Sequence, residues 1–282
     1  MSKVGLVCDS TQDLEPQYLA SRDIRMVPLT VFFGDEAYLD WVDMRPESFY
    51  LRLADSRLLP KTSQPTPARF AAAFREMAEE GCTSIVSIHL TSKLSGTYES
   101  AMIAAKEAPI PVHVIDTLLV SQALGLVVKA AADARDAGAD VDEVVEVTNR
   151  TAATTELFFV LETLDYLVKG GRAGRAAGLA ASVLDIKPVL RFVDGVIEPF
   201  KKSRGTGKAF AELAAFVAAD SGRTGPHRLT LLHACAPERV AALERAVLDA
   251  GADVEVEGTG LVGAVVGTYA GPGAVGLAYH PL

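Results

Sequence analysis

The sequence predicts an α/β fold organised as two α/β domains, and three observations lead to that prediction. The chain has 282 residues, which is more than the size at which a single hydrophobic core usually stops growing. Hydrophobic residues make up 49% of it, enough to fill two cores. Short apolar runs alternate with helical patterns along the first half, an order typical of a mainly parallel sheet covered by helices.

The first half opens with a short apolar run, residues 3–10, that stops at Asp9-Ser10 as a buried strand followed by a turn does. Thr66 and Pro67 form a good helix start, with Thr66 as the N-cap and Pro67 in the first helical position. That helix is predicted to end on a glycine. The patterns of this half predict further strands at 24–34, 84–90 and 112–117 and helices at 67–81, 95–108, 118–138 and 142–154.

The pattern changes near residue 155, where we expect a boundary between a domain of residues 1–155 and one of residues 156–282. A hairpin is predicted over 187–205 because Asp194-Gly195 is a favoured two-residue turn. The other patterns predict strands at 156–164, 228–236 and 253–258, helices at 207–220 and 237–250, and a glycine-rich helix–turn–strand ending over 261–282. Together they predict a mixed sheet for the C-terminal domain.

The charge and composition of the chain argue against a nucleic-acid-binding protein and against a membrane protein. The net charge of −9 and the pI near 5.1 argue against a nucleic-acid partner and against an anionic membrane surface. The uncharged stretch 261–282 holds five glycines, so neither a spanning helix nor stable membrane insertion is expected. No signal peptide is visible, and the balance suits a cytoplasmic bacterial protein. Cys8, Cys82 and Cys235 are predicted to be free thiols, with Cys8 and Cys235 buried in apolar, strand-like runs.

Three short polar side chains, Thr62, Ser63 and Gln64, stand just before the helix expected at 67–81. Pro65 pushes Gln64 towards an extended conformation, so Thr62 and Ser63 are expected in extended chain with their side chains on alternate sides. Such hydroxyls can simply satisfy the backbone of a loop. A stiff loop also loses less entropy when it grips a ligand, which keeps a binding role open.

A second polar segment, residues 92–98, leaves one predicted strand and enters a helix. Unpaired backbone N–H groups at a helix start favour an anion, and Gly96 would let a ligand approach the backbone closely. Ordinary capping by Ser95 explains the same residues. Loops at the carboxyl ends of parallel strands line the usual crevice, so Thr62 and Ser95 are candidates for one shared site.

Seven blocks of the sequence together resemble the bacterial DegV family of fatty-acid-binding proteins. They occur in family order from end to end, namely DSTQDL (9–14), KTSQPTP (61–67), SKLSGTY (92–98), VIDT (114–117), LVKGGRAGR (167–175), KPVL with DGVIEPFKKSRG (187–205) and GTYAGPGAVG (267–276). The resemblance implies a long-chain fatty acid buried between two α/β domains, with its carboxylate held by hydroxyls of two loops. Carried over to this chain, Thr62 and Ser95 hold the carboxylate, with the Gly96 backbone close by and Arg172 as a neighbour.

The resemblance also implies a macromolecular partner. Some members serve as the acyl-carrying subunit of fatty-acid kinase, and the kinase partner supplies the ATP site. Arg204 matches a position expected to face that partner, although basic clusters are usually solvated surface; the role of Arg175 stays open. Tyr269 is also expected to face the partner, and it departs from the pattern because kinase-coupled members commonly carry a histidine there. Tyrosine is not cationic near neutral pH, so lipid binding should survive and kinase coupling is less secure.

Other functions fit the sequence less well. Two G-x-G-x-x-G patterns, at 258–263 and 271–276, lack the downstream acidic residue of a dinucleotide fingerprint. A serine hydrolase built on Ser95 has no G-x-S-x-G elbow and no paired histidine, and no metal or nucleotide motif is visible. Asp9 and Asp116, at strand ends, suit turns or caps. We therefore expect a non-enzymatic carrier, with no cofactor besides the bound fatty acid and no catalytic or metal-binding residues. An acyl hydrolase or transferase that uses the same hydroxyl site is the alternative.

Overall fold

A computed structural model describes residues 3–179 and 186–282. Its first large sheet is parallel throughout, as predicted, in the order β2-β1-β6-β7. These strands are β1 (Val4–Asp9), β2 (Ile24–Val27), β6 (Ser84–His89) and β7 (Val112–Asp116). The strand β1 is buried along its whole length, which explains why it reads in the sequence as an almost unbroken apolar run.

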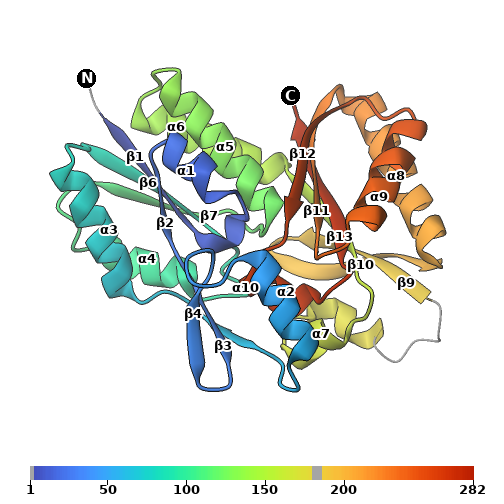
Figure 1. The fold of residues 1–282 in the computed structure, drawn as a ribbon. Helices are drawn as coiled ribbons and strands as arrows, with labels where there is room; N and C mark the ends of the chain where they lie inside the picture. Colours follow the sequence, from blue (N-terminus) through green and yellow to red (C-terminus); the bar gives the residue numbers. More distant parts are fainter. Residues whose placement is uncertain (1–2, 180–185) are drawn as a thin grey trace.

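Helices cover both faces of this sheet (Figure 1). They are α1 (Pro16–Ser21), which follows the 3₁₀ turn η1 (Ser10–Gln12), then α3 (Pro67–Glu79), α4 (Thr97–Ala105), α5 (Gln122–Asp136) and α6 (Val141–Thr154). Successive side chains of a strand point to opposite faces, so Val7 packs against Phe70 and Phe74 of α3 while Leu6 and Cys8 pack on the side of α5 and α6. Thr66 and Pro67 start α3 as predicted, although the Thr66 side chain makes no capping hydrogen bond.

A small antiparallel sheet, β4-β3-β5, corrects the prediction of one strand over 24–34. Its strands are β3 (Thr30–Phe33), β4 (Glu36–Leu39) and β5 (Lys61–Ser63), and α2 (Pro46–Asp55) lies between β4 and β5 in sequence. The expected strand is divided at Pro28, which has no N–H to donate to a ladder. Residues before Pro28 join the parallel sheet, and residues after it cross to the small sheet.

The second large sheet is mixed, as predicted, in the order β10-β9-β8-β13-β11-β12. Its strands are β8 (Glu156–Val160), β9 (Ile186–Val193), β10 (Val196–Arg204), β11 (His227–His233), β12 (Val254–Leu261) and β13 (Val275–Pro281). Only the pair β11–β12 is parallel within the described residues. The hairpin β9–β10 turns at Asp194 and Gly195, both with positive φ, and confirms the predicted two-residue turn.

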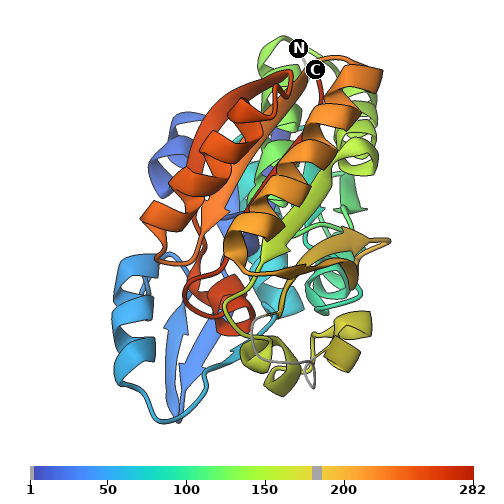
Figure 2. The ribbon, with the colours of Figure 1, turned by 90° about the vertical axis from the view of Figure 1, so that its right-hand side faces the viewer.

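The two faces of this mixed sheet have different neighbours. Figure 2 shows α8 (Thr206–Thr224) and α9 (Pro237–Asp249) lying over its outer face. In β8, Phe158 and Val160 pack towards these helices, whereas Leu157 and Phe159 belong to the core cluster shared with the first half of the chain. The inner face of the mixed sheet therefore turns towards the parallel sheet. Three further short elements lie near it, α7 (Asp165–Lys169), the 3₁₀ turn η2 (Gly174–Leu179) and α10 (Ala264–Ala270).

The structure tests the predictions made for the cysteines and for a membrane-spanning helix. All three cysteines are free, and Cys8 is buried as predicted, but the prediction for Cys235 is wrong because its side chain is exposed. The strand β11 ends at His233, and Cys235 adopts a left-handed φ of 55° in the following turn, which rotates it away from the core. In the described parts of the chain, no helix is both long and apolar enough to cross a membrane.

The predicted boundary near residue 155 stays a prediction. The strands of the parallel and small sheets all precede residue 117, and those of the mixed sheet all follow residue 155. One core cluster nevertheless runs across that position and joins both halves.

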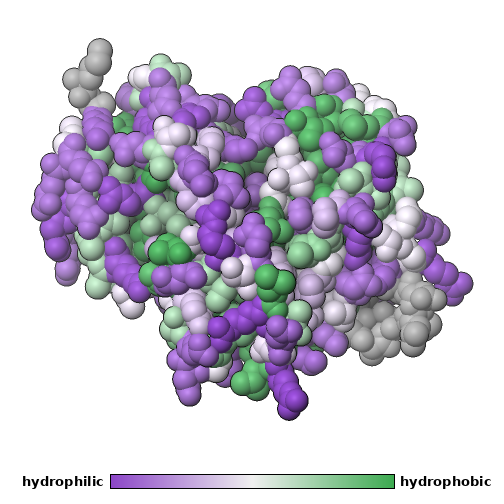
Figure 3. Space-filling view, in the orientation of Figure 1, coloured by the Kyte–Doolittle hydropathy of each residue, from purple (hydrophilic) through white to green (hydrophobic). Residues whose placement is uncertain are grey.

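Hydrophilic residues predominate on the face seen in Figure 3, with hydrophobic ones in small groups between them.

Candidate functional site

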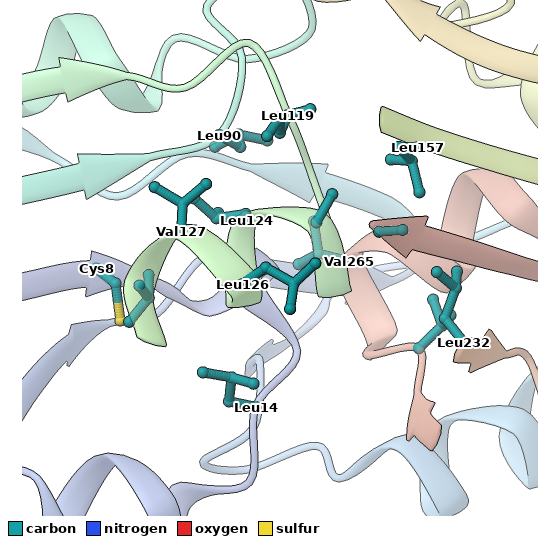
Figure 4. Close-up of a cluster of buried hydrophobic side chains, with 14 of the residues drawn as sticks. Cys8, Leu14, Leu90, Leu119, Leu124, Leu126, Val127, Leu157, Leu232 and Val265 are labelled. Carbon is teal, nitrogen blue, oxygen red and sulfur yellow. The ribbon is translucent and has the colours of Figure 1, made fainter. Parts of the chain in front are cut away.

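A cavity lies between the two halves of the chain. Its volume is about 120 Å³, counted as the space that the centre of a water molecule can occupy. Most of its lining is apolar, from Leu29, Leu90, Leu94, Val120, Leu157, Phe159, Leu161, Leu167, Phe192, Ile197, Leu232, Val262, Val265, Val266, Ala270, Ala274 and Val275. Figure 4 shows Leu90 of the first half and Leu157 and Leu232 of the second around Val265 of α10.

A smaller group of polar residues completes the lining. These residues come from widely separated segments and are Thr11, Thr62, Ser63, Gln64, Ser95, Ser121, Arg172 and Tyr269. Among the described residues that line the cavity, Arg172 is the only charged one. The structure thus brings Thr62, Ser95 and Arg172, three of the predicted carboxylate-binding residues, to the wall of one cavity.

The direction of the Thr62 side chain is set by the pairing of β5 in the small sheet. It pairs with Val31 of β3, and the alternation of side chains along β5 leaves Lys61 and Ser63 exposed while Thr62 is half-buried. The expected extended conformation with alternating side chains is therefore observed. The Thr62 Oγ1 and the Tyr269 hydroxyl lie 2.6 Å apart, which is a hydrogen bond in which either group can be the donor.

The loop of Ser95 and Gly96 meets the loop of Gln64. Gly96 is the N-cap residue of α4 and makes no side-chain cap, while Ser95 Oγ lies 2.9 Å from Thr97 Oγ1. The Gln64 side chain lies so close over Gly96 that a Cβ at position 96 would overlap its amide group. Gly96 is therefore required by the close approach of the two loops, and the interpretation of Ser95 as the helix cap does not hold.

Arg172 lies against the ring of Tyr269. Its guanidinium carbon is 4.9 Å from the ring centroid, and Nη1 donates to the Gly170 carbonyl at 2.9 Å and Nε to the Leu94 carbonyl at 3.4 Å. A guanidinium has five N–H donors, so further donors remain for an anion in the cavity. A Cβ at position 170 would overlap the Tyr269 ring, so Gly170 provides the space for that ring.

The two positions predicted to face a partner lie in different places. Arg204 is exposed at the end of β10 and does not line the cavity. Tyr269 is half-buried, lines the cavity and contacts both Thr62 and Arg172. Arg175, whose role the sequence left open, is exposed and forms an ion pair with Glu198. The contact of Tyr269 with Thr62 had no signal in the sequence, because the two residues are far apart along the chain.

A buried Ser–His–Asp network was also missed by the sequence analysis. Ser87 Oγ lies 2.7 Å from His89 Nε2, and His89 Nδ1 lies 3.1 Å from Asp9 Oδ2. All three residues have no exposed surface and none lines the cavity, so no substrate reaches them. Asp9 also accepts the backbone N–H groups of Thr11 and Leu90, which suits the turn role expected for it. The network ties together the carboxyl ends of β1 and β6.

The model of the DegV family, described as "Uncharacterised protein, DegV family", matches residues 3–282. The chain belongs to the DegV family. A DegV domain-containing protein of Streptomyces coelicolor is 40% identical to it over 274 residues, which is 97% of each chain.

Solved DegV structures share its fold. A structure described as fatty acid binding of a DegV family protein from Thermus thermophilus has a TM-score of 0.92 at 35% identity, covering 99% of this chain and 100% of the other. A stearic-acid-binding protein from Eubacterium ventriosum has a TM-score of 0.88 at 26% identity, covering 100% of this chain and 98% of the other. These matches confirm the family expected from the seven sequence blocks.

Proposed function

We propose that this DegV protein binds one long-chain fatty acid, with its carboxylate at Thr62, Ser95 and Arg172 and its acyl chain in the apolar cavity. One observation carries the proposal. The cavity lining is apolar apart from hydroxyl-bearing residues, one amide and one guanidinium, which is the distribution that a molecule with one anionic end and a long hydrocarbon tail requires. The DegV relatives described as fatty-acid-binding proteins support the same assignment.

The tail supplies most of the binding free energy. Burying about 15 methylenes at ~0.8 kcal/mol each contributes at most roughly 12 kcal/mol. A hydrogen bond to a charged group contributes only about 1.5–3 kcal/mol. The polar residues therefore fix where the carboxylate sits more than how tightly the acid binds.

The contact between Thr62 and Tyr269 orients the hydroxyl that meets the carboxylate. When Tyr269 donates its proton to Thr62 Oγ1, the Thr62 proton is free to point at a carboxylate oxygen. Arg172 adds positive charge beside it and is itself held by the Leu94 and Gly170 carbonyls. Gly96 at the start of α4 does not line the cavity and is covered by the Gln64 side chain, so its backbone would meet the ligand only after Gln64 moves aside.

We further propose that the bound carboxylate is presented to a fatty-acid kinase subunit. A carboxylate oxygen would attack the γ-phosphorus of ATP on the partner, forming an acyl phosphate and releasing ADP, so the present chain would act as the acyl carrier and not as the enzyme. Ser63 and Gln64 line the cavity and are exposed, which supports access from outside. Arg204 and the neighbouring Lys201 and Lys202 are exposed cations that suit contact with a partner.

Native mass spectrometry of freshly purified protein tests the carrier function. A co-purified long-chain acid is expected, and added stearic acid should raise the melting temperature of protein that has been stripped of lipid. Apo protein that shows no thermal shift with any long-chain acid would overturn the proposal. Turnover of a chromogenic acyl ester that is lost in Ser95→Ala would instead support the hydrolase.

A further inference from the structure

Two buried carboxylates of the first half contact the first turn of α10. Asp13 Oδ1 accepts the Gly263 N–H at 3.0 Å, and Asp40 Oδ1 accepts the Ala264 N–H at 3.1 Å. Both acids are buried, and neither lines the cavity. We call Asp13 and Asp40, together with the backbone amides that they accept, the carboxylate cap. It joins segments that are more than 200 residues apart in the chain.

Hydroxyl and indole groups also donate to the two carboxylates. Ser121 Oγ donates to Asp13 Oδ2 at 2.6 Å, and Ser10 Oγ donates to Asp40 Oδ2 at 2.7 Å. Trp41 Nε1 adds a longer contact to Asp13 Oδ1 at 3.4 Å. The Gly263 and Ala264 N–H groups can only donate, so their bonds to the two carboxyl groups are strongest when the carboxyl groups are ionised.

The helix that the cap holds is also a wall of the cavity. Val265, Val266, Tyr269 and Ala270, four of the seven residues of α10, line it. Tyr50 fixes the segment just before the helix by donating its hydroxyl to the Val262 carbonyl at 3.1 Å. A displacement at the first turn of such a short, stiff helix carries its last turn with it. Tyr269 would then lose its reach to Thr62.

We propose that Asp13 and Asp40 are positioning residues for the ligand site: in their ionised form they hold α10 where Tyr269 bonds to Thr62, and protonation of Asp40 weakens acid binding. This inference rests on the proposed fatty-acid binding, because it concerns the affinity of that same site. The two aspartates act through α10 and touch no ligand.

The surroundings of the cap place this protonation near neutral pH. Burial raises the pKa of Asp40 to about 7, and burial raises the pKa of Asp13 well above its ordinary value. The titratable groups that face the pair are Asp9 and Tyr50, and neither is a cation. Arg45 stacks on Trp41 but forms its ion pair with Glu15, and no cation bonds to either cap carboxylate in the described residues. Backbone and hydroxyl donors alone therefore oppose the cost of burying the charge.

The experiment measures the affinity for stearic acid between pH 6 and pH 8, a range in which the carboxyl group of the ligand, with an ordinary pKa of about 4–5, stays ionised. Wild-type affinity is expected to rise with pH, with a midpoint that reflects the Asp40 pKa of about 7. In Asp40→Asn the affinity should be about tenfold lower than the wild type at pH 8, the loss expected for one charge-assisted hydrogen bond, and should depend less on pH than in the wild type, because only Asp13 of the cap remains to titrate. In Ser10→Ala the midpoint should move to higher pH, because the Ser10 hydrogen bond lowers the pKa of Asp40. Asp35→Asn, an exposed carboxylate in the β3–β4 turn, is the matched control and should follow the wild type.

Trp41 gives a second measurement that needs no ligand. It is the single tryptophan of the chain, and it contacts Asp13 within the cap. Its fluorescence should titrate near pH 7 in the wild type and not in Asp40→Asn. A wild-type affinity that does not change with pH, or an Asp40→Asn variant that keeps the wild-type slope, would overturn the inference. If stearic acid does not bind at any pH while Trp41 fluorescence still titrates, the proposed fatty-acid binding is wrong and the titration of the carboxylate cap is supported. If Trp41 fluorescence does not change with pH, the titration of the carboxylate cap is wrong, and fatty-acid binding is unaffected.

Discussion

The hydroxyl of Thr62 and the phenolic hydroxyl of Tyr269 lie 2.6 Å apart although 207 positions separate them in sequence. Thr62 belongs to the small antiparallel sheet, and Tyr269 to the last turn of α10. The hydrogen bond therefore joins the two halves of the chain at the polar part of the cavity wall. The predictions below ask what each partner around this contact contributes.

Thr62→Val removes one hydroxyl at almost constant shape. We expect fatty-acid binding to weaken by about 1–3 kcal/mol, because a carboxylate would lose a donor in a partly buried site. Titration calorimetry measures the affinity, and circular dichroism should show an unchanged fold. Thr83→Val, an exposed threonine before β6, is the control. Equal affinity in both variants would remove Thr62 from the site.

Tyr269→Phe keeps the ring beside Arg172 and removes only the hydroxyl. We expect a loss of about 1 kcal/mol of binding free energy, since Thr62 would lose the donor that orients it. Because both changes break the same hydrogen bond, the double variant with Thr62→Val should lose less than the sum of the two single losses. Strict additivity would show that the two hydroxyls act independently on the ligand.

Gly170→Ala tests the packing behind the site. The added Cβ would overlap the Tyr269 ring, so the ring should shift away from Thr62 and acid affinity should fall by about tenfold or more, as for the loss of a charge-assisted hydrogen bond. Gly222→Ala in α8 adds the same atom where no neighbour lies within 4 Å. That control should bind normally and unfold at an equal or higher temperature, because alanine favours a helix interior over glycine. Normal binding by both variants would contradict the assigned role of Gly170.

Arg172→Gln separates the charge of the ligand from its hydrophobic tail. The variant should bind stearic acid more weakly by about 1.5–3 kcal/mol, the contribution of a hydrogen bond to a charged group. It should bind the uncharged methyl ester as the wild type does, because the ester carries no anion for the guanidinium. An equal loss for acid and ester would mean that Arg172 only shapes the cavity.

Stability should fall with rising pH through the range in which Asp40 titrates. The pKa of Asp40 is raised by burial to about 7, so between the ordinary aspartate pKa and this value the folded state holds a proton that the unfolded state has released. The contribution of Asp40 is thus fully present at acidic pH and lost as the pH rises through about 7. Urea unfolding at several pH values should show a smaller slope in Asp40→Asn than in the wild type. An unchanged slope would mean that Asp40 ionises in the folded state as it does in water.

The sequence alone determined the fold class and most of the elements. Buried strands such as β1 and amphipathic helices such as α3 depend on local periodicity, and the Asp194-Gly195 turn depends on backbone preferences of two residues. The seven family blocks also pointed to Thr62, Ser95 and Arg172, which line one cavity. The strands, helices and turn could be predicted because their causes lie within a few residues of chain, whereas the three site residues followed from the family resemblance.

Only the tertiary structure determined which residues of the two halves contact each other. The crossing to the small sheet after Pro28, the overlap of Gln64 on Gly96 and the bond of Tyr269 to Thr62 each join distant segments. The carboxylate cap on α10 is of the same kind, since nothing near Asp13 or Asp40 in sequence marks them as partners of Gly263 and Ala264. The exposure of Cys235 depended on where β11 ends. Such contacts arise from packing one sheet against another, and a local pattern carries no information about which surface will lie opposite.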